Sequence, residues 1–176
     1  MMKRSGFLVA ALAATALAGL SADAQVLKGH DSNAPVNFTA DRIEVQDKAN
    51  RVVVSGNVEV TQAGLTLNAA RMTVAYHNGA SGSGVEIDRL DASGNVVVTK
   101  GDETARGNVA IYDLNKRMIT MLGNVRLTQG SNNLSGGRLI IDLTTGRSTV
   151  DGRAAPGSGG VSSSGSGRVS GSFTVP

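Results

Sequence analysis

The sequence predicts an all-β domain, either a roll or a barrel-like sandwich of short strands. After residue 35, apolar and polar residues alternate with a period of two, which is the pattern of half-buried strands. Turn signals rich in Gly, Asn and Asp separate these stretches, and none of the stretches holds the helical period of about 3.6 residues. One alternating stretch also recurs, and a tandem repeat adds the possibility of a stacked, solenoid-like arrangement.

The recurring stretch reads RVVVSGNVEVTQ at residues 51–62 and returns in modified form at residues 90–100 and 119–129. Each copy carries a Gly-Asn pair at the same phase of the alternation. The three pairs begin at Gly56, Gly94 and Gly123. The chain is therefore predicted to be a stack of related β-hairpin layers.

The segments that follow the first and third copies predict a bend in each layer. In residues 65–76 and 134–143 the apolar parity flips partway, and such a flip requires an extra residue in the ladder. We therefore expect a bulge or corner near Ala69-Ala70 and near Gly136-Gly137. After the middle copy, residues 105–111 keep one parity, which predicts a layer that bends less.

Shorter strands are predicted on either side of the repeats. Val36–Thr39 and Asp41–Val45 precede the first copy, and Arg147–Val150 adds a last strand. Val36–Thr39 at one end of such a stack, and Leu139–Leu143 with Arg147–Val150 at the other, could present unpaired backbone groups, and these ends carry little charge to protect them. Strand addition by a partner is thus plausible, and identical chains joining through two different edges would form an open head-to-tail filament. The alternative is that the flanking tails fold over the edges.

The start of the chain has the composition of a secretory signal peptide. Lys3-Arg4 forms a basic region, an apolar run extends from Phe7 to Leu20, and an Ala-x-Ala site follows. We expect cleavage between Ala24 and Gln25. An uncleaved membrane anchor is the alternative, but the apolar run is short for a span that needs about 20 residues.

The remaining chain divides into three parts. Residues 25–34 are expected to form a flexible lead-in, and residues 35–151 the β-domain. Residues 152–176 are mostly Gly and Ser, with few apolar residues to pack. Burial cannot offset the ordering entropy of such a tail, so we expect residues 152–176 to be disordered.

No arrangement of residues predicts catalysis or metal binding. The chain contains no cysteine, and His30 and His77 are expected in a lead-in and a turn, without metal-ligand spacing. Asp41 and Asp142 flank strands and are expected to be turn or capping groups rather than an acid/base pair. We therefore expect no catalytic residue, no metal and no cofactor. An enzyme acting on cell-envelope polymers is the weakest hypothesis.

The charge pattern argues against a nucleic-acid partner. The net charge is only +3, and the signs alternate along the predicted strands. This pattern is typical of a solvated outer face, so no nucleic-acid partner is expected.

The predicted interior is aliphatic and rich in glycine. The glycines on inward parities are Gly56, Gly94, Gly107, Gly123 and Gly136. They permit two interpretations. An under-filled interior could accept straight acyl chains, each buried methylene contributing about 0.8 kcal/mol. Alternatively, the glycines mark bends and bulges and the aliphatic side chains pack on one another, which the residues by themselves favour.

Residues 33–151 contain a set of short motifs that point to a known family. They are Ala34-Pro35-Val36, Ala40-Asp41, Ser55-Gly56-Asn57-Val58, Val60-Thr61-Gln62, Leu67-Asn68-Ala69, Gly123-Asn124-Val125-Arg126-Leu127-Thr128-Gln129 and Gly136-Gly137-Arg138-Leu139. Through these motifs the segment resembles the OstA-like domain of the LptA family of lipopolysaccharide transport proteins. Each motif is short, and their combination with a predicted cleavable signal is more specific than any one of them.

The resemblance implies an antiparallel β-jellyroll, an open-ended stack of bent hairpin layers whose apolar groove shields the acyl chains of lipopolysaccharide. It also implies head-to-tail stacking in the periplasm, with further copies of the chain, an LptC-like inner-membrane protein and the amino-terminal domain of an LptD-like outer-membrane protein. Such a bridge catalyses nothing. The alternatives are an anchored relative of the LptC type and a ligand-free structural β-roll that polymerises as a scaffold.

The resemblance assigns the inward positions to the lipid-binding groove. These are Val36, Phe38, Val52, Val54, Val58, Val60, Leu65, Leu67, Met72, Val74, Val96, Val98, Ile111, Met121, Val125, Leu127, Leu139 and Ile141. Docking of a partner strand at the edges is expected at Val36, Asn37, Phe38, Leu139, Ile140 and Ile141.

Overall fold

The structure is a computed structural model that describes residue 27 and residues 29–79, 84–152 and 167–174. Ten antiparallel strands join in one bent sheet within these residues, and the helical content described is one turn of 3-10 helix at Asp47–Ala49. The prediction of an all-β antiparallel fold is confirmed.

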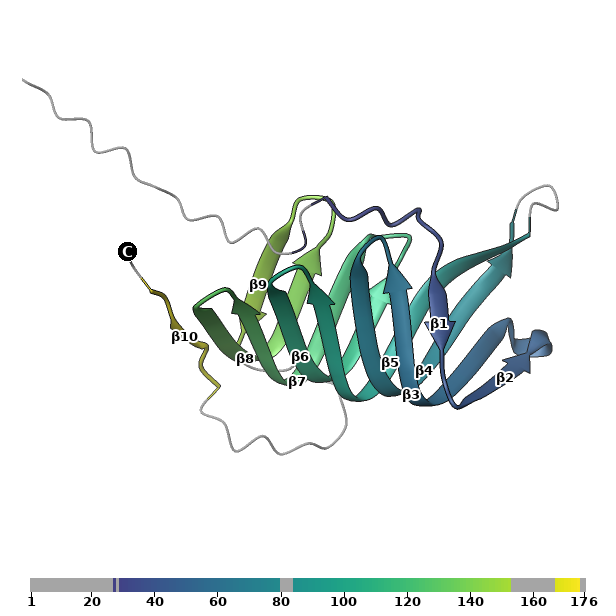
Figure 1. The fold of residues 1–176 in the computed structure, drawn as a ribbon, viewed down its shortest axis with the longest axis horizontal. Helices are drawn as coiled ribbons and strands as arrows, with labels where there is room; N and C mark the ends of the chain where they lie inside the picture. Colours follow the sequence, from purple (N-terminus) through teal and green to yellow (C-terminus); the bar gives the residue numbers. More distant parts are fainter. Residues whose placement is uncertain (1–26, 28, 80–83, 153–166, 175–176) are drawn as a thin grey trace, which may run out of the picture.

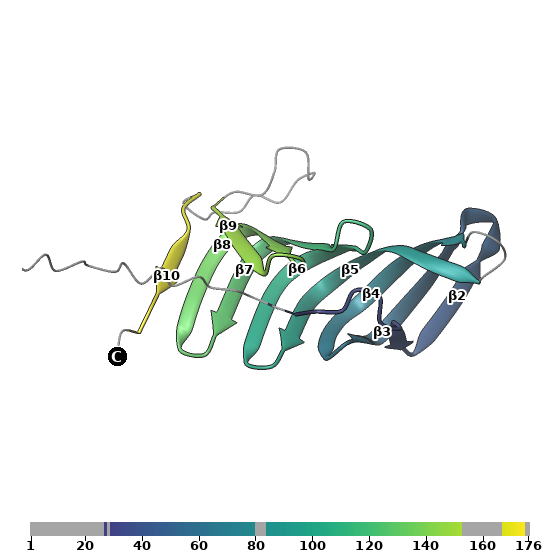
Figure 2. The same cartoon turned by 90° about the horizontal axis from the view of Figure 1, so that it is seen from above.

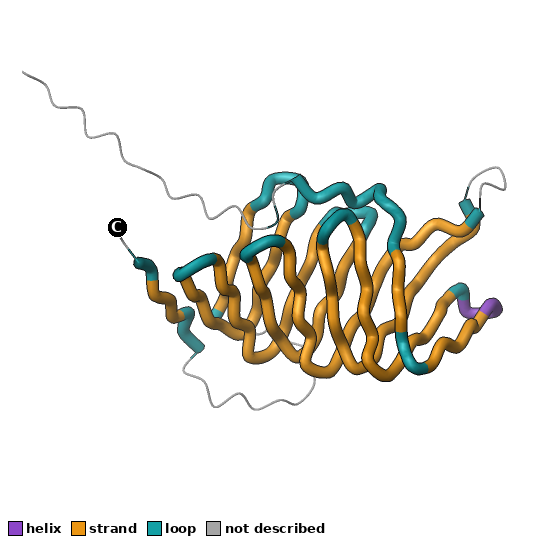
Figure 3. The backbone as a smooth tube through the Cα atoms, in the orientation of Figure 1, coloured by secondary structure: helices purple, strands orange, loops and turns teal. Residues whose placement is uncertain are grey.

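Between residues 37 and 151 the strands follow one another along the chain with short connections (Figures 1 and 3). They are β1 (Asn37–Thr39), β2 (Arg42–Gln46), β3 (Arg51–Gln62), β4 (Leu65–Asn78), β5 (Val85–Lys100), β6 (Glu103–Asp113), β7 (Met118–Gln129), β8 (Asn132–Asp142), β9 (Arg147–Asp151) and β10 (Ser170–Ser172).

The long strands β3 to β8 each contribute to two halves of a roll. At one end of the stack, β1 pairs with residues 59–61 of β3, while β2 pairs with residues 51–55 of the same strand. At the other end, β10 pairs with residues 133–135 of β8 and β9 with residues 138–142. We call the half from β1 to β10 the β1 half, and the half from β2 to β9 the β2 half. The layers follow one another along the longest axis of the molecule, so β2 and β10 lie at opposite ends of it (Figures 1 and 2).

The bend between the halves follows the Gly-Asn pairs of the repeat. In each pair both residues have positive φ, from +76° to +82° at the glycines and from +46° to +49° at the asparagines. Two residues of β3 there face one residue of β4, and β7 faces β8 in the same way. The predicted irregularities near Ala69-Ala70 and Gly136-Gly137 are thus confirmed, with the inserted residue on the facing strand. Bulges of this kind bend a sheet sharply.

The middle layer bends as well, so the prediction that it bends less is wrong. Ala105 and Gly107 point inward, but after the register shift between Arg106 and Val109 the buried positions become Ala110 and Tyr112. Ile111, expected in the groove, therefore points away from the interior and is partly exposed. The alternation pattern did not reveal this change of parity, because the outward-facing Val109 and Ile111 are also apolar.

The two ends of the chain also differ from expectation. Leu27 and His30 are buried, so the lead-in packs on the domain at these residues instead of being flexible. The expected disorder of the tail is wrong for Ser170–Ser172, because this segment pairs with β8.

The predicted signal peptide and its cleavage site lie outside the described residues. Among the residues described, no helix has the length and apolar character to cross a membrane.

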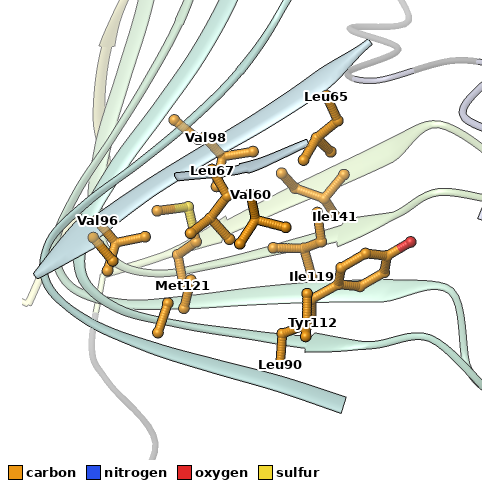
Figure 4. Close-up of a cluster of buried hydrophobic side chains, with 14 of the residues drawn as sticks. Val60, Leu65, Leu67, Leu90, Val96, Val98, Tyr112, Ile119, Met121 and Ile141 are labelled. Carbon is orange, nitrogen blue, oxygen red and sulfur yellow. The ribbon is translucent and has the colours of Figure 1, made fainter. Parts of the chain in front are cut away.

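The core lies between the two halves. Figure 4 shows Val60, Leu67 and Val98 pointing toward Tyr112, Ile119 and Ile141, so the inward faces of the β1 half and the β2 half meet. These side chains are at most 2% exposed. The core is therefore a single continuous apolar layer enclosed by the bent sheet.

Candidate functional site

Most of the residues expected in the groove converge on this interior. Exposure is 0–3% at Val54, Val58, Val60, Leu65, Leu67, Met72, Val74, Val96, Val98, Met121, Val125, Leu127, Leu139 and Ile141. Val36, Phe38 and Val52 are partly buried against the same cluster. Ile111 lies outside it. The cluster also holds Leu90, Ile119 and Tyr112, which the expected site omits. Leu90 and Ile119 lie on the inward parity of the repeats, so the apolar alternation is sufficient to predict them. Tyr112 can be predicted as inward only if the bulge in β6 is known.

The interior is closed in this conformation. Because its side chains are almost fully buried, the two halves pack on one another and leave little surface for water. The glycines predicted to face inward mark close approaches instead, and Gly94 is itself exposed. A Cβ at Gly94 would lie 2.7 Å from the Cβ of Ala70, and one at Gly136 would lie 2.6 Å from the carbonyl oxygen of Asp151. The structure thus supports the interpretation that these glycines serve bends and close packing.

A polar rim borders the interior on the side opposite the Gly-Asn bends. The inward parity of the β1 half ends at Gln62, Lys100, Glu103 and Gln129. Gln129 Nε2 donates to Glu103 Oε1 at 2.8 Å. From the β2 half, the Tyr112 hydroxyl donates to Gln62 Oε1 at 2.9 Å. This last bond joins the two halves directly at the rim.

The segment before β1 lies along this rim. Gln62 Nε2 donates to the carbonyl oxygens of Ser32 and Ala34 at 3.0 and 2.9 Å. His30 Nε2 lies 3.1 Å from Gln62 Oε1 and 3.3 Å from the Tyr112 hydroxyl. Figure 1 shows the segment running along the roll to β1. The Gln62 amide is therefore shared between the segment and both halves.

The environment of His30 disfavours its charged form. Gln62 Oε1 can only accept, so Nε2 of His30 carries the proton and Nδ1 is the bare nitrogen. Nδ1 is buried and has no hydrogen-bond partner. Burial lowers the pKa of His30, Lys100 adds to the lowering, and the bond to Gln62 and the nearby Asp31 oppose it. Burial likewise raises the pKa of Tyr112.

A second polar cluster lies at the far tip of β4 and β5. His77 Nδ1 lies 2.9 Å from Asp88 Oδ1, its Nε2 lies 3.4 Å from Glu86, and Asn115 donates to Asp88 at 3.0 Å. His77 lies within β4 and not in the expected turn. No set of three acidic, His or Cys side chains suited to a metal exists within the described ranges.

Asp142 accepts from the amides of Thr144 and Thr145, which confirms its expected turn role.

The two ends of the roll differ from the expected docking edges in one respect. Leu139, Ile140 and Ile141 do not form an edge, because β9 pairs with this stretch. The outermost strands at that end are β9 and β10. At the other end, Ile43 and Val45 of β2 are 51% and 60% exposed. Since they pair with Val54 and Val52, their side chains share the inward face and extend it to the end of the roll.

A bent antiparallel roll that encloses an aliphatic interior defines the β-jellyroll class. The family described as "LptA/(LptD N-terminal domain) LPS transport protein" matches residues 37–147. The chain therefore belongs to this family, which confirms the resemblance seen in its sequence. The family consists of transport proteins and not of enzymes.

Two individual proteins illustrate the relationship. The uncharacterized protein R00383 of Rhizobium meliloti (strain 1021) is 31% identical over 121 residues, which cover 66% of this chain and 65% of the relative. This chain thus spans about 65% of that relative's length. The crystal structure of LptH, the LptA-homologous periplasmic component of the lipopolysaccharide transport device of Pseudomonas aeruginosa, superposes with a TM-score of 0.69 at 19% identity. The match covers 83% of this chain and 99% of LptH, and it shows a shared fold.

Proposed function

We propose that this chain is a periplasmic bridge protein that binds lipopolysaccharide, shields its lipid A acyl chains inside the roll and passes it from the inner to the outer membrane. The observation that carries the proposal is the continuous aliphatic interior, which extends to an exposed apolar end at Ile43 and Val45. The membership of the chain in a lipopolysaccharide transport family supports the choice of ligand.

Acyl chains would occupy the space between the two halves. Each buried methylene contributes about 0.8 kcal/mol, so several acyl chains would replace the apolar packing that the halves give each other in the closed roll. The groove residues would be the inward set given above without Ile111 and with Tyr112, Leu90 and Ile119. The Gly-Asn bends are the natural hinge for this opening, because they join the halves along one side only.

Head-to-tail stacking would carry the lipid from one roll to the next. The β2 end exposes Ile43 and Val45, and the opposite end exposes Val169 and Phe173 beside β10. Two different apolar ends on one chain favour an open stack over a closed dimer. The partners would be further copies of this chain, an LptC-like protein at the inner membrane and the amino-terminal domain of an LptD-like protein at the outer membrane.

The closed interior favours one alternative, a structural β-roll that polymerises without ligand. Native mass spectrometry of the mature protein from periplasm separates the two. Bound lipopolysaccharide together with a ladder of oligomers is the expected result. A ladder that stays free of lipid after lipopolysaccharide is added would favour the scaffold. Sequencing of the mature amino terminus tests the third hypothesis, since an intact start in the membrane fraction would indicate an anchored LptC-type relative.

A second experiment tests the stacking end. Replacing Ile43 and Val45 with Asp places charge on the exposed apolar face and should shift the oligomer ladder to monomer while the fold persists. Glu44, which lies between them on the other face of β2, provides the matched control as Glu44→Gln. An unchanged ladder in the double variant would exclude the β2 end as the stacking surface.

A further inference from the structure

We propose that Leu27 and residues 29–34, here called the strap, are a displaceable occupant of the rim, and that an acylated ligand gains access to the interior only after the strap leaves. This inference rests on the proposed function. It identifies what opens the roll, and it assigns the opening step to the rim side.

The strap joins the two halves of the roll. The Leu27 amide donates to Glu103 and the Gln62 amide holds two strap carbonyls, so the β1 half supplies two attachments. His30 reaches the Tyr112 hydroxyl, which belongs to the β2 half. With the strap in place, the halves therefore cannot move apart at the rim without breaking these bonds. Figure 2 shows the same segment running lengthwise between the two rows of strands.

The attachment of the strap differs from that of the strands. Strand pairing begins only at Asn37, so the strap is not paired with any strand of the sheet. Its buried apolar anchor is Leu27, while Gly29, Asp31 and Asn33 are exposed. A segment held by a few side-chain bonds and one apolar anchor opens more readily than the sheet it covers.

The buried network under the strap is incompletely satisfied. Nδ1 of His30 has no partner while the strap is docked, and an unmet buried acceptor opposes docking. When the strap leaves, water or a ligand can reach this nitrogen. The same step frees the strap-binding groups of Gln62 and Glu103. These groups lie beside the apolar interior, where they would meet the polar headgroup of a ligand whose chains lie inside.

A reversible tether tests the strap directly. The chain has no cysteine, so His30→Cys with Gln62→Cys creates the only thiol pair, at positions whose side chains approach within 3.1 Å. A short bis-maleimide with a central disulfide would then lock the strap on the rim. Fluorescently labelled lipopolysaccharide is the probe. Loading should slow by about tenfold or more in the tethered protein, because the open state becomes scarce, and recover after reduction.

The tether carries its own steric control. After reduction both halves of the linker remain attached, so any recovery reflects release of the strap and not removal of bulk. Arg106→Cys with Arg126→Cys is the matched pair, since these exposed residues are register partners on β6 and β7. Its tether should leave loading unchanged.

The outcomes separate this inference from the proposed function. Equal loading in the tethered and reduced forms would overturn the strap as the gate and leave lipopolysaccharide binding intact. An absence of loading in the untethered wild-type protein would instead contradict the proposed function. Hydrogen exchange at the Leu27 amide gives a second readout, because ligand binding should remove its protection. Retained protection in the loaded protein would also overturn the proposal.

Discussion

The two long sides of the roll are closed in different ways. On one side the backbone itself turns at Gly56, Gly94 and Gly123, and the geometry is fixed by positive φ angles and close contacts. On the other side the closure consists of hydrogen bonds among Gln62, Tyr112 and the strap. The first side resists change through steric exclusion, and the second holds through bonds that water or a ligand can replace. The roll is therefore hinged along the bends and fastened along the rim.

The largest effect is expected at the bends. Gly94→Ala places a methyl group in a φ of +82° and within 2.7 Å of the Cβ of Ala70. The strain and the clash together should lower the free energy of unfolding by about 3 kcal/mol. Gly101→Ala is the matched control, because Gly101 has a φ of +59° with nothing within 4 Å of the added atom.

The control separates backbone strain from close approach. Gly101→Ala should cost about 1 kcal/mol, the conformational part only. Urea unfolding of both variants provides the comparison. Equal losses would show that the contact with Ala70 contributes nothing, and that the bends are held by backbone conformation only.

A smaller effect is expected at the rim. Tyr112→Phe keeps the buried ring but removes the hydroxyl that donates to Gln62, so unfolding should become easier by about 1 kcal/mol. Tyr76→Phe is the control, since the Tyr76 hydroxyl makes one long bond of 3.4 Å to Asp47 near the surface. Loading of lipopolysaccharide should become faster in Tyr112→Phe and stay unchanged in Tyr76→Phe. Slower loading in Tyr112→Phe would contradict the fastening role of the rim.

The bends were predictable from the sequence, and the rim was not. The recurring Gly-Asn pair and the parity flip after Ala69 mark the corner because both are local features of one or two strands. The flip in β6 escaped because Val109 and Ile111 are apolar although they face outward. Apolar alternation therefore predicts where a strand lies, but it does not predict whether the strand contains a bulge when the outward residues are also apolar.

The rim and the ends depend on contacts between distant parts of the chain. His30 and Tyr112 are 82 residues apart, and neither forms a motif with its neighbours in sequence. The Gly-Ser composition of the tail predicts disorder, yet Ser170–Ser172 pairs with β8 through backbone groups that any residue possesses. Amino-acid composition indicates how much apolar surface the side chains can bury. It does not show whether a sheet edge elsewhere in the fold has free backbone groups that can pair with the segment.

The smallest expected effect is a pH dependence of strap docking, which should be confined to the rim and absent from the bends. Burial lowers the pKa of His30 while the strap is docked, so the released strap binds a proton more readily than the docked one. Docking is therefore at full strength above the ordinary histidine pKa of about 6.5 and weakens as the pH falls below it. The charged and titratable groups around the imidazole are Asp31, Lys100 and Tyr112.

Hydrogen exchange of the Leu27 amide between about pH 7.5 and 5.5, corrected for intrinsic rates, measures this weakening. Protection should fall in the wild-type protein and stay level in His30→Gln, which retains a donor toward Gln62 but cannot be protonated. Amides at the Gly-Asn bends should respond equally in both proteins, because the two histidines of the chain lie elsewhere, His30 at the rim and His77 near the end of β4. A parallel loss at the bends would mean that acid loosens the whole roll, and the distinction between a fixed hinge and a releasable fastening would fail.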